Sequence, residues 1–192
     1  MDNLAIMKEC GAFLEGHFLL SSGLHSGGYC QCAKLLRFPD KAAAVLSSVA
    51  GQVKALPITK VCGPAMGGVI VSYELARQLG VESIFTERKD GEMQLRRGFS
   101  VGPGDRILIT EDVVTTGKST LETVKVLEDM GAAVIGVACI VDRRAPDCGF
   151  ALPVYPALKL DIGLYDPADC PLCAEGKLRL EKPGSRETLP VR

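Results

Sequence analysis

Short runs of β-branched and aliphatic residues alternate along the chain with longer segments whose apolar residues recur at helical spacing. The apolar runs 58–62, 82–86, 106–111 and 133–141 predict buried strands. Residues 40–56, the segment ending near Leu79, and residues 118–130 predict the intervening helices. This alternation predicts an α/β fold: a parallel sheet with helices on both faces. Ligands of such sheets bind beyond the carboxyl ends of the strands.

Both ends of the chain depart from this alternation. Residues 4–15 predict an amphipathic helix, and residues 17–33 predict short strands broken by Ser- and Gly-rich turns. The tail 161–192 carries prolines and cysteines and predicts irregular structure. A length of 192 residues suits one domain, so we expect a single domain over 1–192.

Charge and hydropathy narrow the possible partners. The net charge of −1 shows no basic footprint for nucleic acid. No apolar run reaches membrane-spanning length, and the start Met-Asp-Asn-Leu lacks a basic-then-apolar signal. We therefore expect a cytoplasmic protein with neither a nucleic-acid nor a membrane partner.

Eight cysteines are many for such a chain, and reduced thiols are the expectation in the cytoplasm. Cys170 and Cys173 have the spacing of half a zinc site or of a redox pair. Cys148 is a candidate third ligand, but a structural zinc site needs four ligands. We expect unpaired thiols in the C-terminal tail; the alternative is a metal site or a disulfide, and which of these two stays open. The two histidines, His17 and His25, are expected to be structural or surface residues.

The most informative stretch joins the strand 106–111 to the helix 118–130. The strand ends in two acids, Glu111 and Asp112, and a hydroxyl-rich turn, 115–120, follows. Gly117-Lys118-Ser119 looks like the end of a Walker A loop, but that motif needs a glycine where Asp112 stands. Backbone N–H groups at a helix start bind phosphate, and the acids can hold hydroxyls or a divalent cation. The order suits a ribose 5-phosphate.

This stretch resembles the 5-phosphoribosyl 1-diphosphate (PRPP) signature of type I phosphoribosyltransferases. The resemblance implies that family's fold, a parallel sheet flanked by helices with a small N-terminal hood, here residues 1–35. It also implies that Glu111 and Asp112 hold the ribose, with Asp112 catalytic. Mg²⁺ would be bound through PRPP, with these two acids as candidate further ligands. The remaining PRPP-binding residues would be Val113, Val114, Thr115, Thr116, Gly117, Lys118, Ser119, Met66 and Gly67.

The charged segment 87–97 is expected to be a mobile lid with no apolar face to dock on its own domain. Cations that close over the leaving pyrophosphate would stabilise its charge, and Arg88 and Lys89 are the candidate catalytic residues. A solvated hairpin is the other interpretation of this segment. In better-known family members the lid has a second lysine and a histidine, whereas this chain offers Arg96 and Arg97.

Within the family, the hairpin 20–30 is similar to that of orotate phosphoribosyltransferases, through Leu20, Ser22, Gly23 and Ser26. Ser21, Met66-Gly67 and Cys30 depart from the pattern, which indicates a divergent subgroup. The resemblance implies that Thr115, Arg143, Tyr29 and Cys30 bind orotate. Arg144 is the alternative if the register differs by one.

The expected activity is therefore transfer of 5-phosphoribosyl from PRPP to orotate, giving orotidine 5′-phosphate and pyrophosphate in pyrimidine biosynthesis. The resemblance also implies a homodimer whose lid reaches over the neighbouring subunit's site. A purine or xanthine phosphoribosyltransferase is one alternative, and a PRPP-fold regulator without turnover is another.

Overall fold

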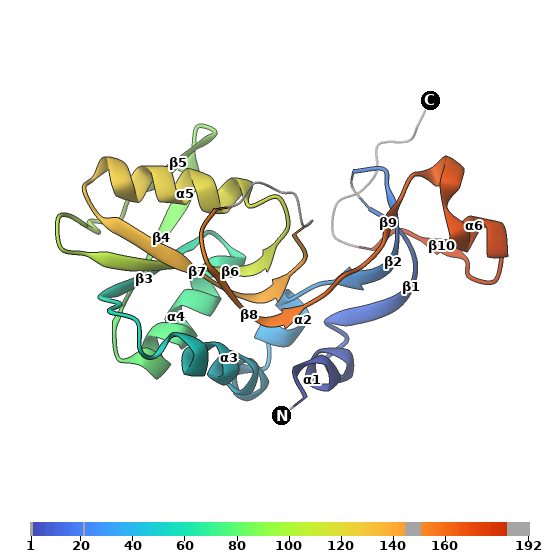
Figure 1. The fold of residues 1–192 in the computed structure, drawn as a ribbon, viewed down its shortest axis with the longest axis horizontal. Helices are drawn as coiled ribbons and strands as arrows, with labels where there is room; N and C mark the ends of the chain where they lie inside the picture. Colours follow the sequence, from blue (N-terminus) through green and yellow to red (C-terminus); the bar gives the residue numbers. More distant parts are fainter. Residues whose placement is uncertain (1, 21, 145–150, 184–192) are drawn as a thin grey trace.

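A six-stranded sheet with helices on both faces forms the larger part of the molecule (Figure 1). The computed structural model describes residues 2–20, 22–144 and 151–183. The strands lie in the order β5-β4-β3-β6-β7-β8. All are parallel except β5, which is antiparallel to β4. Their bounds are β3 Lys60–Pro64, β4 Glu82–Lys89, β5 Glu92–Leu95, β6 Arg106–Val114, β7 Ala133–Asp142 and β8 Val154–Lys159. The predicted α/β architecture is confirmed.

Alternation along the central strands divides the core into two layers. Leu108 of β6 faces α3 (Pro39–Val53) and α4 (Gly67–Leu79), where Leu46 and Leu75 are fully buried. Ile107 and Ile109 face the opposite way, toward α5 (Lys118–Asp129). Because side chains of a strand alternate between faces, an apolar run such as 107–109 needs a helix on each side. Among the described residues, no helix has the length and apolarity to cross a membrane.

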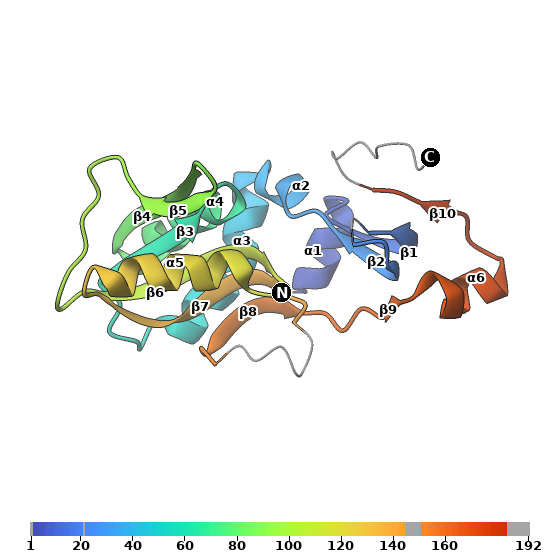
Figure 2. The same cartoon turned by 90° about the horizontal axis from the view of Figure 1, so that it is seen from above.

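A smaller sheet lies at the other end of the molecule (Figure 2), and we call it the hood sheet. Its order is β10-β1-β2-β9, so the two ends of the chain share it. The strands are β1 Phe13–Leu19, β2 His25–Cys30, β9 Leu164–Tyr165 and β10 Leu180–Glu181. Three short helices are associated with it or follow it: α1 Asn3–Glu9, α2 Ala33–Leu36 and α6 Pro171–Glu175, with a 3₁₀ turn at Pro167–Asp169.

Two expectations about the chain ends are wrong. The first helix ends at Glu9, not at residue 15, because Gly11 adopts a positive φ and Phe13 begins β1. The tail is not wholly irregular, since β9, α6 and β10 lie within it. The expected short strands in 17–33 are confirmed as β1 and β2.

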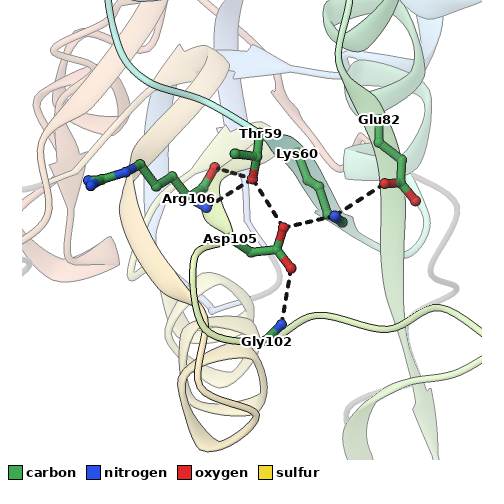
Figure 3. Close-up of polar contacts among 6 residues, drawn as sticks. All are labelled: Thr59, Lys60, Glu82, Gly102, Asp105 and Arg106. Carbon is green, nitrogen blue, oxygen red and sulfur yellow. Dashed lines mark hydrogen bonds and ion pairs between the residues drawn. The ribbon is translucent and has the colours of Figure 1, made fainter.

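A polar network fastens the amino ends of the central strands (Figure 3). Lys60 of β3 lies between Glu82 of β4 and Asp105, with Nζ–O distances of 3.2 and 2.8 Å. Asp105 also accepts hydrogen bonds from the Gly102 N–H and the Thr59 hydroxyl (Figure 3). These contacts lower the pKa of Asp105, the Lys60 hydrogen bond contributing most. The amino edge of the sheet is thus closed by ion pairs.

Candidate active site

Glu111 and Asp112 lie near the carboxyl end of the strand β6. This strand ends at Val114, three residues beyond the predicted end. Being adjacent in a strand, the two acids point to opposite faces. Glu111 faces α5, where it accepts a 3.5 Å hydrogen bond from the Thr120 hydroxyl. Asp112 faces α4 and accepts a hydrogen bond from the Val113 N–H at 2.9 Å. The acid pair therefore straddles the carboxyl edge of the sheet.

Both carboxyls resist ionisation in this position. Burial and the neighbouring Asp112 raise the pKa of Glu111 to about 8. Burial also raises the pKa of Asp112, partly offset by the Val113 hydrogen bond. Two buried carboxylates side by side repel each other. A ligand that brings hydroxyl donors or a cation would therefore be stabilised here.

The glycine-rich loop between β3 and α4 packs directly on Asp112. A Cβ at Gly67 would lie 2.5 Å from the Asp112 carboxyl, and one at Gly68 would lie 2.6 Å from the Thr110 carbonyl. A Cβ at Gly63 would overlap the Gly68 carbonyl. Only glycine permits these approaches. The motif thus brings the loop containing Met66 and Gly67 next to the acid pair.

A hollow lies over the turn that follows β6. It is lined by Glu111 and by residues 113–120. Gly117 has a φ of 70° and directs the chain into α5, which begins at Lys118. The first N–H groups of a helix lack partners within it, and they carry the positive end of the helix dipole. The geometry suits a phosphate at this turn.

Arg143 stands beside this turn and next to the hood. Its backbone N–H donates to the Val114 carbonyl at 2.9 Å, which places it alongside the end of β6. Its Nε is buried and has no hydrogen-bond partner among the described residues. The guanidinium lies near enough to Tyr29 and Cys30 to lower their pKa values, although burial raises both more strongly. Three of the four residues expected to bind the base, Arg143, Tyr29 and Cys30, are therefore brought together.

Arg144 has a different role. Its Nε and Nη2 donate to the two carboxylate oxygens of Asp142, each at 2.9 Å, and Asp142 is buried. A bidentate pair of this kind holds both side chains in place. Of the two neighbouring arginines, Arg143 is the one with an unpartnered buried donor.

The hood and the acid pair are in direct contact through Cys32. Its thiol donates to the Asp112 carbonyl at 3.6 Å. Neither Cys32 nor Thr120 was among the residues predicted for the site. The Cys32 contact joins residues 80 positions apart, so local sequence carries no signal for it. Thr120 lies in the hydroxyl-rich turn, and its alignment with Glu111 follows from the start of α5.

The segment expected to be a free lid is a hairpin anchored on the body of the protein. Met93 of β5 is buried, and Leu95 packs on the apolar layer below α5. The expectation that this segment lacks an apolar face is therefore wrong. Arg88 pairs with Glu122 of α5, and Arg97 pairs with Glu87. Within the described parts of the chain, neither Arg88 nor Lys89 lines the hollow over the phosphate turn.

Comparison with known proteins agrees with this arrangement. Residues 39–147 match the phosphoribosyl transferase domain family. An orotate phosphoribosyltransferase of Thermotoga maritima is 49% identical over 181 residues, which cover 94% of this chain and 96% of that protein.

Solved structures show the same fold. An orotate phosphoribosyltransferase from Aeropyrum pernix has a TM-score of 0.70 at 25% identity, covering 81% of this chain and 92% of that one. An adenine phosphoribosyltransferase from Rhodothermus marinus has a TM-score of 0.56 at 23% identity, covering 69% of this chain and 86% of that one. The latter likeness concerns the fold alone.

Proposed function

The chain belongs to the phosphoribosyltransferase family, and from this premise we propose that it transfers 5-phosphoribosyl from PRPP to orotate. The products are orotidine 5′-phosphate and pyrophosphate, which makes the reaction a step of pyrimidine biosynthesis. The near full-length match to an orotate phosphoribosyltransferase supports the substrate pair. The seven described cysteines that form no disulfide fit a cytoplasmic location, where thiols stay reduced.

Orotate recognition rests on one observation, the buried and unpartnered Nε of Arg143. A buried guanidinium donor without a partner costs free energy until a ligand supplies an acceptor. Orotate offers a carboxylate and carbonyl oxygens, which match the planar fork of donors. Tyr29 and Cys30 flank the guanidinium and would enclose the base, with Thr115 nearby as a further donor.

PRPP would lie across the carboxyl edge of the sheet. The N–H groups and hydroxyls of the turn Thr115, Thr116, Gly117, Lys118 and Ser119 bind the 5-phosphate. Glu111 and Asp112 hold the ribose hydroxyls, and the backbone at Met66 and Gly67 receives the pyrophosphate. The close packing of Gly67 on Asp112 supports this order, because it places the two subsites side by side.

The acid pair is also suited to Mg²⁺. The cation prefers oxygen ligands and commonly combines carboxylates with phosphates. Burial raises the pKa values of Glu111 and Asp112, and a bound cation would favour their charged forms. Bound with PRPP, Mg²⁺ would stabilise the negative charge of the departing pyrophosphate.

In the transfer step, a ring nitrogen of orotate releases its proton to solvent and attacks C1 of the ribose while the C1–O bond to pyrophosphate breaks. The electron pair of that bond leaves with the pyrophosphate. Arg143 orients the base, and the acid pair orients the ribose, so the protein needs no covalent nucleophile. Arg88 and Lys89 are proposed to reach the pyrophosphate after Arg88 leaves Glu122 and the hairpin moves.

A homodimer completes this proposal. Met66, the N-cap of α4, forms an apolar stripe with Ile70 and Tyr73 of that helix, and their exposed fractions are 83%, 50% and 71%. Such a stripe marks an interaction surface, and it is continuous with the loop that receives pyrophosphate. A second copy of the chain is the proposed occupant. Sedimentation should give twice the chain mass, and a monomer mass at working concentrations would contradict the dimer.

The test follows orotate absorbance after addition of PRPP and Mg²⁺. Absorbance should fall with the native protein, and Asp112→Asn should lower turnover by roughly 10²-fold or more, because positioning and charge at the reacting centre are lost. Asp129→Asn, on the exposed end of α5, is the matched control and should keep full activity. Turnover of adenine or xanthine in place of orotate would instead favour a purine enzyme. PRPP binding without any turnover would favour a regulator.

A further inference from the structure

Four side chains of metal-binding type converge where the β1–β2 hairpin meets the tail. They are His17 of β1, His25 of β2, and Cys170 and Cys173 at the start of α6. Their ligand atoms all lie within 4.8 Å of one another. His17, His25 and Cys170 are buried, so the cluster is shielded from solvent on most sides.

The distances within the cluster match those of a tetrahedral zinc site. His17 Nε2 lies 3.0 Å from His25 Nδ1. Cys170 Sγ lies 3.5 Å from His17 Nε2, and Cys173 Sγ lies 3.7 and 3.4 Å from the two ring nitrogens. Ordinary zinc bond lengths in a tetrahedron give about 3.3 Å between two nitrogens and about 3.6 Å between nitrogen and sulfur.

A backbone carbonyl orients the imidazole ring of His17 for metal binding. The Leu178 carbonyl lies 3.4 Å from Nδ1, so that nitrogen can donate its proton to the carbonyl. The lone pair of Nε2 then points into the cluster. Metal-binding histidines are typically oriented by such a second partner.

Hydrogen bonding alone does not account for this cluster. Two thiols and the ring of His25 all approach the single nitrogen His17 Nε2. One acceptor lone pair serves one donor well, whereas one cation in the centre serves all four groups. The two cysteines are free thiols and not a disulfide.

Apart from the short pairings of β9 with β2 and of β10 with β1, little in the described tail attaches it to the hood. Among the described residues of α6 and the strands β9 and β10, none is buried, and Leu164, Leu178 and Leu180 are exposed. Cys170 is the buried residue of this region. Figure 1 shows α6 at the outer end of the hood sheet, far from the helices of the main core. Apolar burial therefore contributes little to holding the tail.

We propose that His17, His25, Cys170 and Cys173 bind a structural Zn²⁺ that fastens the tail to the hood hairpin. Four protein ligands leave no open position, as in other structural zinc sites. The sequence shows only the Cys-x-x-Cys half of this site. The histidines lie about 150 positions away, for example 153 between Cys170 and His17, so spacing cannot reveal them.

The experiment measures metal content in the full chain, expressed without a histidine tag and purified under reducing conditions. Elemental analysis and native mass spectrometry should find one zinc per chain. Cys173→Ser should lose most of this zinc, whereas Cys10→Ala, at the end of α1 and outside the cluster, should keep it. Loss from both variants or retention in both would overturn the assignment.

Cobalt supplies a readout that does not depend on any variant. The chelated, reduced native protein should take up one Co²⁺ and show the visible bands and near-ultraviolet thiolate charge transfer of a tetrahedral site. Zinc should displace it, and chelation should speed proteolytic cleavage within residues 163–183. Failure of the reduced protein to take up zinc or cobalt, or a Cys170–Cys173 disulfide in the protein as isolated, would overturn the proposal.

Discussion

At the scale of single residues, Arg143 and Arg144 show how neighbours can serve different purposes. The Nε of Arg143 is buried without a hydrogen-bond partner beside Tyr29 and Cys30, whereas the guanidinium of Arg144 forms an ion pair with Asp142. The first arrangement leaves a donor for the proposed ligand, and the second stabilises the end of β7. The resemblance to the family indicated Arg143 but left Arg144 open, because sequence alone cannot say which guanidinium has a partner.

Substitution should separate these two roles. Arg143→Ala should lower kcat/KM for orotate roughly 10- to 100-fold through KM, with little change for PRPP, because a charge-assisted hydrogen bond is lost. Arg144→Ala should instead destabilise the protein by about 1.5–3 kcal/mol, because the buried Asp142 carboxylate loses its guanidinium hydrogen bonds. Steady-state kinetics and denaturant unfolding measure both. An equal effect of Arg143→Ala on the two substrates would remove Arg143 from the base site.

Glu111 should make stability depend on pH in the ligand-free protein. Its pKa is about 8 when folded and near 4.5 when unfolded. Between these values the folded state keeps a proton that the unfolded state loses, so the free energy of unfolding falls as pH rises. The slope from this group is at most about 1.4 kcal/mol per pH unit. Glu111→Gln should flatten the decline in Tm from pH 5 to pH 8, and parallel curves for the two proteins would contradict the assignment.

At the scale of elements, the glycine loop shows how a turn positions a carboxyl group. Gly67→Ala would insert a methyl group 2.5 Å from the Asp112 carboxyl, so one of them must move. Activity should fall at least 10-fold, since a displacement near 1 Å at a reacting centre has a cost of that order. Gly51→Ala is the matched control, because nothing lies within 4 Å of its Cβ and it sits inside α3. This variant should keep activity and gain up to about 1 kcal/mol of stability. Full activity of Gly67→Ala would show that the contact has no role.

The ion-paired amino edge of the sheet should contribute to stability and not to catalysis. Asp105→Ala removes the acceptor shared by Lys60, Gly102 and Thr59, and should cost about 1–3 kcal/mol. Asp129→Ala, which breaks an exposed pair with Lys125, should change Tm much less. Thermal unfolding compares the two variants. A similar Tm for both would mean that the network of Figure 3 is energetically neutral.

Element boundaries were predicted best where the hydrophobic period was unambiguous. The helices α3, α4 and α5 lie close to their predicted ranges, as do the starts of β6 and β7. The prediction of one helix over residues 4–15 was wrong because Phe13 and Leu14 fit a helical period and a strand equally well. The prediction for the hairpin β4–β5 was wrong for a different reason. Its charged residues predicted a free loop, but the buried side chain of Met93 anchors it. Tertiary packing decides such cases, and a local pattern does not contain it.

At the scale of the whole molecule, the proposed homodimer allows two arrangements: the hairpin acts on its own subunit or on the neighbour. If it acts on the neighbour, mixing inactive Asp112→Asn with inactive Lys89→Ala should restore up to about a quarter of native activity by random exchange. Each mixed dimer then holds one site that combines a native Asp112 from one subunit with a native Lys89 from the other. Tagged subunits must show exchange independently.

The apolar stripe of α4 supplies the control for this mixing experiment. Adding Ile70→Glu to both variants should prevent pairing and abolish the regained activity, because Ile70 lies in the middle of the stripe. Exchange without regained activity would mean that the hairpin serves its own subunit, or that Lys89 is not its working cation.

The strand order of the hood sheet has a consequence for synthesis of the chain. β1 and β2 are synthesised before the strands of the large sheet, but their outer neighbours β9 and β10 are synthesised after them. A chain truncated before Leu164 contains all six strands of the large sheet but lacks β9 and β10. Both outer edges of the β1–β2 hairpin are then unpaired. Bare strand edges invite pairing with other chains. Premature termination would therefore release a product with a complete main core and an aggregation-prone hood. The segment that covers these strand edges is translated only after the large sheet.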